Sequence, residues 1–362
     1  MTKQKSNTHS RRVAFVWLCV ICVTAAGSYF LFARHRTSLQ KVSPVDEPSV
    51  STVSPQLPAT TQPARRIPTR RLLFCDLSTN AHQGRLATVD LNGPREHELH
   101  FYDQLVCMRA DFRGGNGICL HMNLNNPLSP NEAVIFDKEF RIKHVIPLAG
   151  VASRTRVSPN GEWGAVTVFT GGNSYASSRM STKTTVIDIQ TGTTLFDLED
   201  LVVRNKGVVF KQPDFNFWGV TFTKDSRYFY ATLSTGGRIY LIKANLATLQ
   251  ADVICENIEC PSLSPDNARI AFKKRSLSGK RPTWHLAVLN LATLKETLLP
   301  EPEPIDQQVQ WYDNHHVMYA LPEFIVGKPV IMYTKIIAAD GSSPFKKLLS
   351  NADSPVIFHE AY

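Results

Sequence analysis

The short motifs that mark many common enzymes are missing from this chain of 362 residues. It has no Gly-x-Ser-x-Gly elbow for a hydrolase nucleophile, no His-Glu-x-x-His zinc pattern, and no glycine pattern for binding nucleotide phosphates. The adjacent His315 and His316 would point to opposite faces of a strand, so we interpret them as turn residues. We therefore expect no catalytic residues, no metal and no cofactor, and favour a non-enzymatic role.

Excess positive charge is missing from most of the chain, although the formal net charge is +9, from 40 basic and 31 acidic residues. Residues 1–71 hold 11 of the basic and 2 of the acidic residues, which leaves 29 of each sign in residues 72–362. A neutral remainder lacks the broad basic surface that binding to a phosphate backbone requires. We therefore expect no nucleic-acid partner.

One apolar run, residues 13–33, contains 21 residues and no charge, which is long enough to span a bilayer. Basic residues within 1–12 precede it, as the positive-inside rule expects for a cytoplasmic N-terminus. The alternative is a signal peptide cleaved near residues 24–26, which would release a secreted protein. We favour an uncleaved single-pass anchor because the apolar run continues through residues 29–32. Both interpretations place the remainder outside the cytoplasm.

The segment that follows, residues 34–71, holds six prolines among Ser, Thr and Val. It shows no apolar periodicity. Such segments favour extended, poorly packed conformations. We expect a disordered linker that holds the remainder of the chain away from the bilayer.

Similar turns recur in the remainder, at residues 156–161, 221–226 and 262–267, and a β-prone run follows each. Their Pro, Asp and Asn residues suit tight turns. Thr223 and Ser264 lie 41 residues apart, which is the length of a four-stranded propeller repeat of about 40–50 residues. Ser158 and Thr223 lie 65 residues apart, which indicates one repeat with an insertion of about half its length.

Counting these repeats predicts an all-β fold, a six-bladed β-propeller, with seven blades as the alternative. The first predicted blade lacks a leading strand, and we predict that residues 354–358 supply it and close the ring, which removes exposed sheet edges. The predicted blades span about 72–103, 104–150, 151–206, 207–256, 257–303 and 304–350. The predicted organisation is a cytoplasmic basic segment at 1–12, a transmembrane anchor at 13–33, a Pro/Ser/Thr-rich linker at 34–71 and the propeller at 72–362.

Cysteine is sparse, with five cysteines beyond the anchor, so at least one stays unpaired. In an exported domain some pair, and two bridges between adjacent strands are candidates. One joins Cys255 to Cys260, and the other joins Cys107 to Cys119 in the second blade. Buried free thiols are the alternative. The cysteine spacings match no zinc pattern.

Two segments are candidates for a binding surface, the insertion at 171–183 and the aromatic segment at 211–218. Long loops on rigid scaffolds often carry binding, and in a propeller both segments would gather near the central opening. The alternative is that their aromatic side chains pack between blades. The candidate binding residues are Asn173, Tyr175, Arg179, Lys183, Asp214, Phe215, Phe217 and Trp218.

The Ser-Pro-Asp/Asn turns resemble those of TolB-like propeller proteins. Four stretches, at 182–188, 214–222, 229–237 and 259–266, carry the same resemblance. The closest resemblance is to exported, uncharacterised members from actinobacteria. It covers about 72–360 and implies a non-enzymatic, extracytoplasmic propeller. The namesake of the family serves in a periplasmic envelope complex with lipoprotein and colicin partners. This chain departs from it, because the linker at 34–71 leaves no room for the namesake's N-terminal α/β domain.

We therefore expect a membrane-tethered propeller that acts as a scaffold for an envelope or secreted protein. Two alternatives stay open because a fold does not fix a function. One is a propeller enzyme, a lyase or glycan hydrolase, which needs ionisable residues converging at the central channel. The other is a ligand sensor, which needs a pocket on the channel axis.

Overall fold

The computed structural model describes residues 69–92, 96–121, 131–172, 174–176, 180–276 and 282–359. The predicted anchor and nearly all of the predicted linker lie outside these ranges, so both stay predictions. No helix in the described ranges is long and apolar enough to cross a bilayer. Residues 66–362 form one compact unit.

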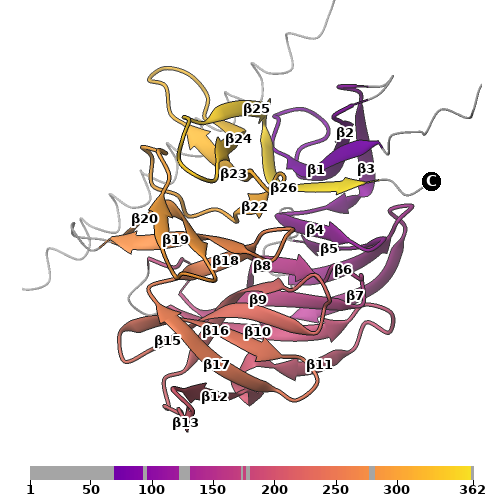
Figure 1. The fold of residues 1–362 in the computed structure, drawn as a ribbon. Coiled ribbons are helices and arrows are strands. Elements are labelled where there is room, and N and C mark those ends of the chain that lie inside the picture. The colour runs from indigo at the N-terminus through magenta and orange to yellow at the C-terminus, as the bar shows by residue number, and fades with distance from the viewer. Residues whose placement is uncertain are drawn as a thin grey trace, which may run out of the picture. The chain divides into compact units, whose positions relative to one another are not determined.

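Six sheets make up the described part of this unit, and the core of each is a four-stranded antiparallel blade (Figure 1). The first blade contains β26 (Ala352–His359), β1 (Arg70–Asp76), β2 (Arg85–Asp90) and β3 (Leu99–Val106). The second contains β4 (Arg109–Arg113), β5 (Asn116–His121), β6 (Asn131–Asp137) and β7 (Ile142–Leu148). The third contains β8 (Val151–Val157), β9 (Trp163–Gly171), β10 (Ser181–Asp188) and β11 (Thr194–Asp197).

The remaining blades follow the same order along the chain. The fourth contains β14 (Asn216–Phe222), β15 (Tyr228–Thr235), β16 (Arg238–Asn245) and β17 (Gln250–Glu256). The fifth contains β18 (Glu259–Leu263), β19 (Arg269–Ser276), β20 (Thr283–Asn290) and β21 (Glu296–Leu298). The sixth contains β22 (Gln310–Trp311), β23 (His316–Glu323), β24 (Ile331–Ala338) and β25 (Lys346–Ser350).

The blades close into a ring through their innermost strands. Around the axis, β4 contacts β8, β8 contacts β14, β14 contacts β18, β18 contacts β22, β22 contacts β26, and β26 contacts β4. The six-bladed propeller predicted from the repeats is therefore confirmed, and the seven-bladed alternative is wrong. Buried apolar clusters fill the space within and between the blades, as the mostly buried strands require.

The recurring turns owe their shape to one hydrogen-bond pattern. Ser158 donates its hydroxyl to the side-chain oxygen of Asn160 at 2.6 Å and accepts the backbone N–H of Trp163 at 2.9 Å. Thr223 and Ser264 make the corresponding bonds in the fourth and fifth blades. Side-chain bonds of this type stabilise the turn locally, so each turn holds an innermost strand against the next strand of its blade.

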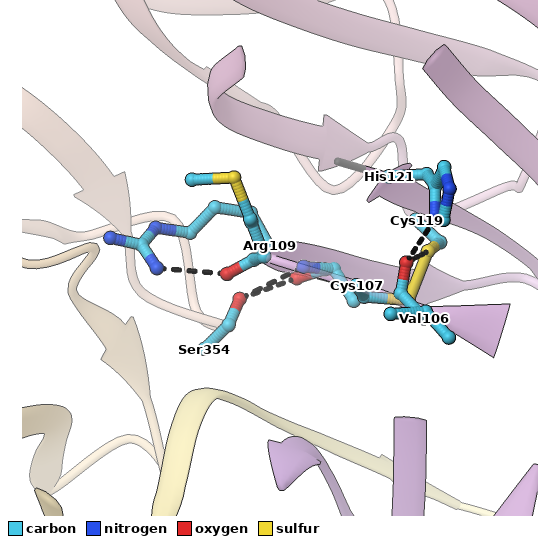
Figure 2. The surroundings of a disulfide bond; sticks show 8 residues. Val106, Cys107, Arg109, Cys119, His121 and Ser354 are labelled. Carbon is cyan, nitrogen blue, oxygen red and sulfur yellow. Dashed lines mark hydrogen bonds between the residues drawn. A yellow bond between two sulfur atoms is a disulfide. The ribbon is translucent and has the colours of Figure 1, made fainter. Parts of the chain in front are cut away.

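The last strand closes the ring, as predicted. Figure 1 shows β26 (yellow) beside β1 (indigo), and their register pairs Leu72 with Ile357. The hydroxyl of Ser354 accepts the N–H of Ala110 and donates to its carbonyl oxygen, at 3.0 Å each (Figure 2). Strands from the two ends of the chain therefore share one blade, and the C-terminal strand also contacts the second blade.

A disulfide between Cys107 and Cys119 joins the segment before β4 to β5 in the second blade (Figure 2). It holds together two positions 12 residues apart. The carbonyl oxygen of Val106 lies 2.8 Å from the Nδ1 atom of His121, which supports the same corner. One of the two candidate disulfides is thus formed.

The other candidate is not formed, because Cys255 and Cys260 are free thiols, as is Cys75. Cys255 lies on β17, the last strand of the fourth blade, opposite Leu241. Cys260 lies on β18, the innermost strand of the fifth blade, and its N–H bonds to Thr232. The two strands are consecutive in sequence but belong to different blades, so their cysteines face different clusters.

The insertion between the first two turns lies mostly after the third blade. A short 3₁₀ helix, η1 (Leu198–Asp200), leads into a hairpin of β12 (Val202–Asn205) and β13 (Val208–Val209). β12 pairs in parallel with β17 and extends the fourth blade at its outer edge to six strands. Leu198 and Val203 are buried in that blade's core. Sequence reasoning placed the insertion at 171–183 and missed this hairpin.

Removal of β26 tests the closure. We expect a chain that ends at Asn351 to lose cooperative thermal unfolding, because the first blade loses its innermost strand and β1 becomes an exposed edge. The measurement is a circular dichroism melt, with a chain ending at His359 as the control. Equal melting curves for the two chains would contradict the closure.

Removal of the disulfide gives a second expectation. The double substitution Cys107→Ser and Cys119→Ser should lower the free energy of unfolding by about 2–4 kcal/mol, since the crosslink restricts the unfolded chain. Urea titration under oxidising conditions measures this change. The control is Cys255→Ser, which removes a half-buried free thiol. If both proteins are equally stable, the bond contributes nothing to folding.

Candidate functional site

A hollow of about 610 Å³ opens at one end of the channel axis. Its volume lies in the range of about 300–1,000 Å³ that is typical of ligand sites. Every innermost strand contributes to its wall, together with the recurring turns. We call this surface the mouth, and its residues are Arg70 and members of the segments 111–113, 156–159, 221–224, 262–267, 310–314 and 357–359.

Positive side chains outnumber carboxylates in the mouth. The cations are Arg70, Arg113, Arg156 and Lys224, and none of them makes a salt bridge to a carboxylate within the described ranges. In a domain whose charges balance, this is a local excess. A cationic concave surface of this kind raises the local concentration of anions.

The two carboxylates of the mouth, Asp111 and Asp313, are both used by the fold. Asp111 is buried and accepts the N–H of Val157 at 2.7 Å and the side-chain amide of Gln310 at 3.0 Å. It therefore ties the second, third and sixth blades together. Asp313 accepts backbone N–H groups in its own turn, at residues 315 and 316. His315 therefore lies in the turn, as interpreted, whereas His316 is the first residue of β23, so the interpretation is wrong for His316.

The arginines of the mouth are held by backbone carbonyl groups rather than by carboxylates. Arg70 donates to the carbonyl oxygen of Tyr312, and its guanidinium lies 3.8 Å from the centre of that ring. Arg113 donates to the carbonyl oxygen of Ile357. Carbonyl groups fix the positions of these side chains but leave their positive charges unneutralised.

Arg156 has the least compensated charge. Its side chain is 8% exposed, and Nη2 donates to the carbonyl oxygen of Val309 at 2.6 Å. Nη1 is buried and has no hydrogen-bond partner among the residues that the structure describes. Burial lowers the pKa of Arg156 to about 10, and the charges of Arg113 and Arg154 act in the same direction, whereas Asp111 opposes them. Burial without a paired charge disfavours the charged form.

The same positive charge acts on His359, at the end of β26. Burial lowers the pKa of this side chain, and the charges of Arg70 and Arg113 lower it further. Arg70, Arg113 and His359 therefore lie near one another in the wall of the mouth.

At the opposite end of the axis, cations are paired with carboxylates, as Arg275 is with Glu259 at 3.2 Å. Lys273 is fully buried, bonds to Asp306, and lies 4.6 Å from the ring centres of both Tyr175 and Trp284. Beside the axis, near Arg154, only about 10 Å³ of space is left. Water and ligands therefore have room at the mouth and little room below it.

The predicted binding residues do not gather into one surface. Tyr175, Phe217 and Trp218 are buried, at 4%, 0% and 0% exposure. Trp218 packs in a cluster with Tyr175, Phe169 and Cys260 between the third, fourth and fifth blades. The alternative, that these aromatic side chains pack between blades, describes all three.

The other predicted residues lie apart from one another. Lys183, on β10, forms an ion pair with Asp197 at 2.8 Å. Asp214 bonds to the hydroxyl of Thr235 and caps a turn, and Phe215 packs half-buried against the core of the fourth blade. Asn173 and Arg179 lie outside the described residues. None of the described candidates lines the mouth. The sequence did not point to the residues that do line it.

Comparison with known proteins places the fold. No protein-family model matches the chain, and no curated protein matches it. Among solved structures, TolB from Acinetobacter baumannii is similar, with a TM-score of 0.56, 14% identity, and coverage of 80% of this chain and 66% of that one. The fold is that of a TolB-like β-propeller.

Two further TolB-like or propeller structures are similar. A chain of a nidogen/laminin complex has a TM-score of 0.50 and 11% identity, over 80% of this chain and 98% of that one. A putative TolB from Agrobacterium tumefaciens has a TM-score of 0.46 and 7% identity, over 82% and 100%. At these identities the likeness concerns the fold. The expected likeness to actinobacterial proteins stays a prediction.

The buried aromatic cluster makes a testable distinction. We expect Trp218→Ala to lower the free energy of unfolding by about 3–5 kcal/mol, as large cavities in packed cores do. The control, Phe324→Ala, removes a ring that is 75% exposed and should change stability by about 0.5 kcal/mol or less. Urea unfolding measures both. A stable Trp218→Ala protein that loses partner binding would instead restore Trp218 as a contact residue.

Proposed function

We propose that this protein is a membrane-anchored, extracytoplasmic binding module, and that its mouth captures a segment of an envelope or secreted protein. The observation that carries the proposal is the mouth itself. It is a hollow of about 610 Å³, and its wall takes residues from all six blades. The role is that of a scaffold, in which a closed ring presents one fixed concave surface.

The rim of the mouth is tied together between blades, which favours binding. The backbone N–H of Asn160 donates to the hydroxyl of Ser226 at 3.2 Å, and the N–H of Lys224 donates to the side chain of Asn267 at 3.1 Å. Turns of the third, fourth and fifth blades are thereby linked. A preorganised surface loses less conformational entropy on binding, so more of the contact energy appears as affinity.

Two features support a location outside the cytoplasm. The apolar run at 13–33 is long enough for an anchor, and a disulfide between Cys107 and Cys119 is typical of oxidising compartments.

Proteins with a similar fold also support a protein partner for the mouth. One of them is a chain in a nidogen/laminin complex, and the fold itself is that of TolB. Propellers bind partners through the loops and turns that surround their axis, because the rigid blades hold those segments in place. The recurring turns of this chain occupy that position.

Site-specific crosslinking tests the proposal in cells. A photoreactive amino acid at Lys224 or Asn314, both exposed at the mouth, should capture the same protein, identified by mass spectrometry. The control position is Phe324, in the connection between β23 and β24 at the other end of the sixth blade. Capture from Phe324 alone would move the binding surface to the opposite face, and capture of nothing from either mouth position would remove the proposal.

A further inference from the structure

The mouth contains one guanidinium, that of Arg156, with a buried terminal nitrogen that an anion could bind. Arg156 projects from β8 into both the mouth and the small cavity below it. One of its terminal nitrogens is bonded to Val309, and the other is buried without a partner. A buried, unsatisfied donor on a charged group is costly, so an acceptor that reaches this nitrogen would form a favourable interaction.

The nearest internal competitor does not fill this role. The charge of Asp111 raises the pKa of Arg156, but the two oxygens of Asp111 are bonded to Val157 and Gln310. Those bonds hold three blades together, so rotation of this carboxylate toward Arg156 would break them. The unsatisfied nitrogen of Arg156 therefore lacks an acceptor from the innermost strands that surround it.

Three further cations share the volume. Within the described ranges, the side chains of Arg70 and Arg113 donate hydrogen bonds only to carbonyl oxygens, and Lys224 is exposed on its turn. A single small anion would engage one or two of these groups. A ligand with several negative charges would engage the buried guanidinium and the rim together, as charge-assisted hydrogen bonds favour.

The wall of the mouth also contains apolar side chains, which favour a ligand that has apolar groups as well as negative charges. Phe222, Leu263, Trp311 and Ile357 belong to the wall of the mouth. An acidic peptide offers carboxylates and apolar side chains at alternating positions, which suits such a wall. A nucleic acid would need a longer basic track, and the charges of residues 72–362 balance.

Resting on the proposed function, we propose that the mouth recognises an acidic peptide segment of the partner, with a carboxylate of that segment bound to Arg156. Arg70, Arg113 and Lys224 receive neighbouring carboxylates, and the apolar wall receives the side chains between them. The recognition is electrostatic at the rim and hydrogen-bonded at the buried guanidinium.

Fluorescence polarisation with synthetic probes tests this recognition on the full-length protein in detergent. The probes are labelled ten-residue peptides of constant Leu and Trp content that carry none, two or four Glu residues. A matched peptide carries Gln at each Glu position. We expect the affinity to rise at least about tenfold from no Glu to four Glu, to fall with added salt, and to be lost in the Gln peptide.

Three variants locate the effect. Arg156→Gln and Lys224→Gln should each weaken binding of the four-Glu peptide by about 3–30-fold. The control, Arg141→Gln, removes an arginine that is 72% exposed and paired with Asp137 outside the mouth, and it should bind normally. Lys224 is exposed on a turn, so its variant keeps the test valid if Arg156→Gln fails to fold.

The outcomes separate this inference from the proposed function. Equal binding of the Glu and Gln peptides would overturn the inference that the ligand is an acidic peptide. Full affinity in both folded single variants, Arg156→Gln and Lys224→Gln, would overturn it as well. If crosslinking at the mouth still captures a partner, the proposed function stands without it. Inorganic phosphate that binds through Arg156 while no peptide binds would show a site for free anions and would also overturn the inference.

Discussion

The pairing of β26 with β1 is the constraint on which the rest of the structure depends. Without it the first blade has no innermost strand, and the ring contacts from β22 to β26 and from β26 to β4 disappear. The mouth depends on the same strand, because Ile357 and His359 form part of its wall. A binding surface built from all six blades therefore exists only in a closed ring.

Charged side chains are paired differently at the two ends of the propeller axis, and this difference supports the mouth as the binding surface. At the closed end the cation of Lys273 is matched by Asp306 and by the faces of two aromatic rings. At the mouth one buried nitrogen of Arg156 has no partner among the described residues. The carboxylates of Asp111 and Asp313 are bonded to backbone, amide and imidazole groups. Cations are thus paired with carboxylates at one end, whereas at the other end, where a ligand has room, the cations have no carboxylate partner within the described ranges.

Much of the fold was predictable from sequence because its signals are local and repeated. The turns at Ser158, Thr223 and Ser264 fixed the period, and the missing leading strand of the first blade pointed to residues 354–358. The extra hairpin β12–β13 was not predictable, because its short strands gain stability from pairing with the distant β17. The site was missed for a similar reason. Arg156 is unremarkable in sequence, and only the ring brings it beside the arginines of other blades.

Aromatic residues misled the search for a surface. Tyr175 and Trp218 stand out in sequence near charged neighbours, but the interior needs large rings to fill the wedge between blades, and both are buried there. Which residues line the mouth depends on which positions along an innermost strand point toward the axis. Those positions identify a site only after the blades have been placed around an axis.

Lysine footprinting in intact membranes tests the central claim most directly. An amine-reactive reagent is applied to the protein in its membrane and to the purified protein, and the labelling of each lysine is compared by mass spectrometry. The account predicts that Lys224, at the mouth, is protected in the membrane sample, whereas Lys328, which is exposed in the connection between β23 and β24, is labelled equally in both. Equal labelling of Lys224 in the two samples, with protection of Lys328 instead, would contradict a binding surface at the mouth.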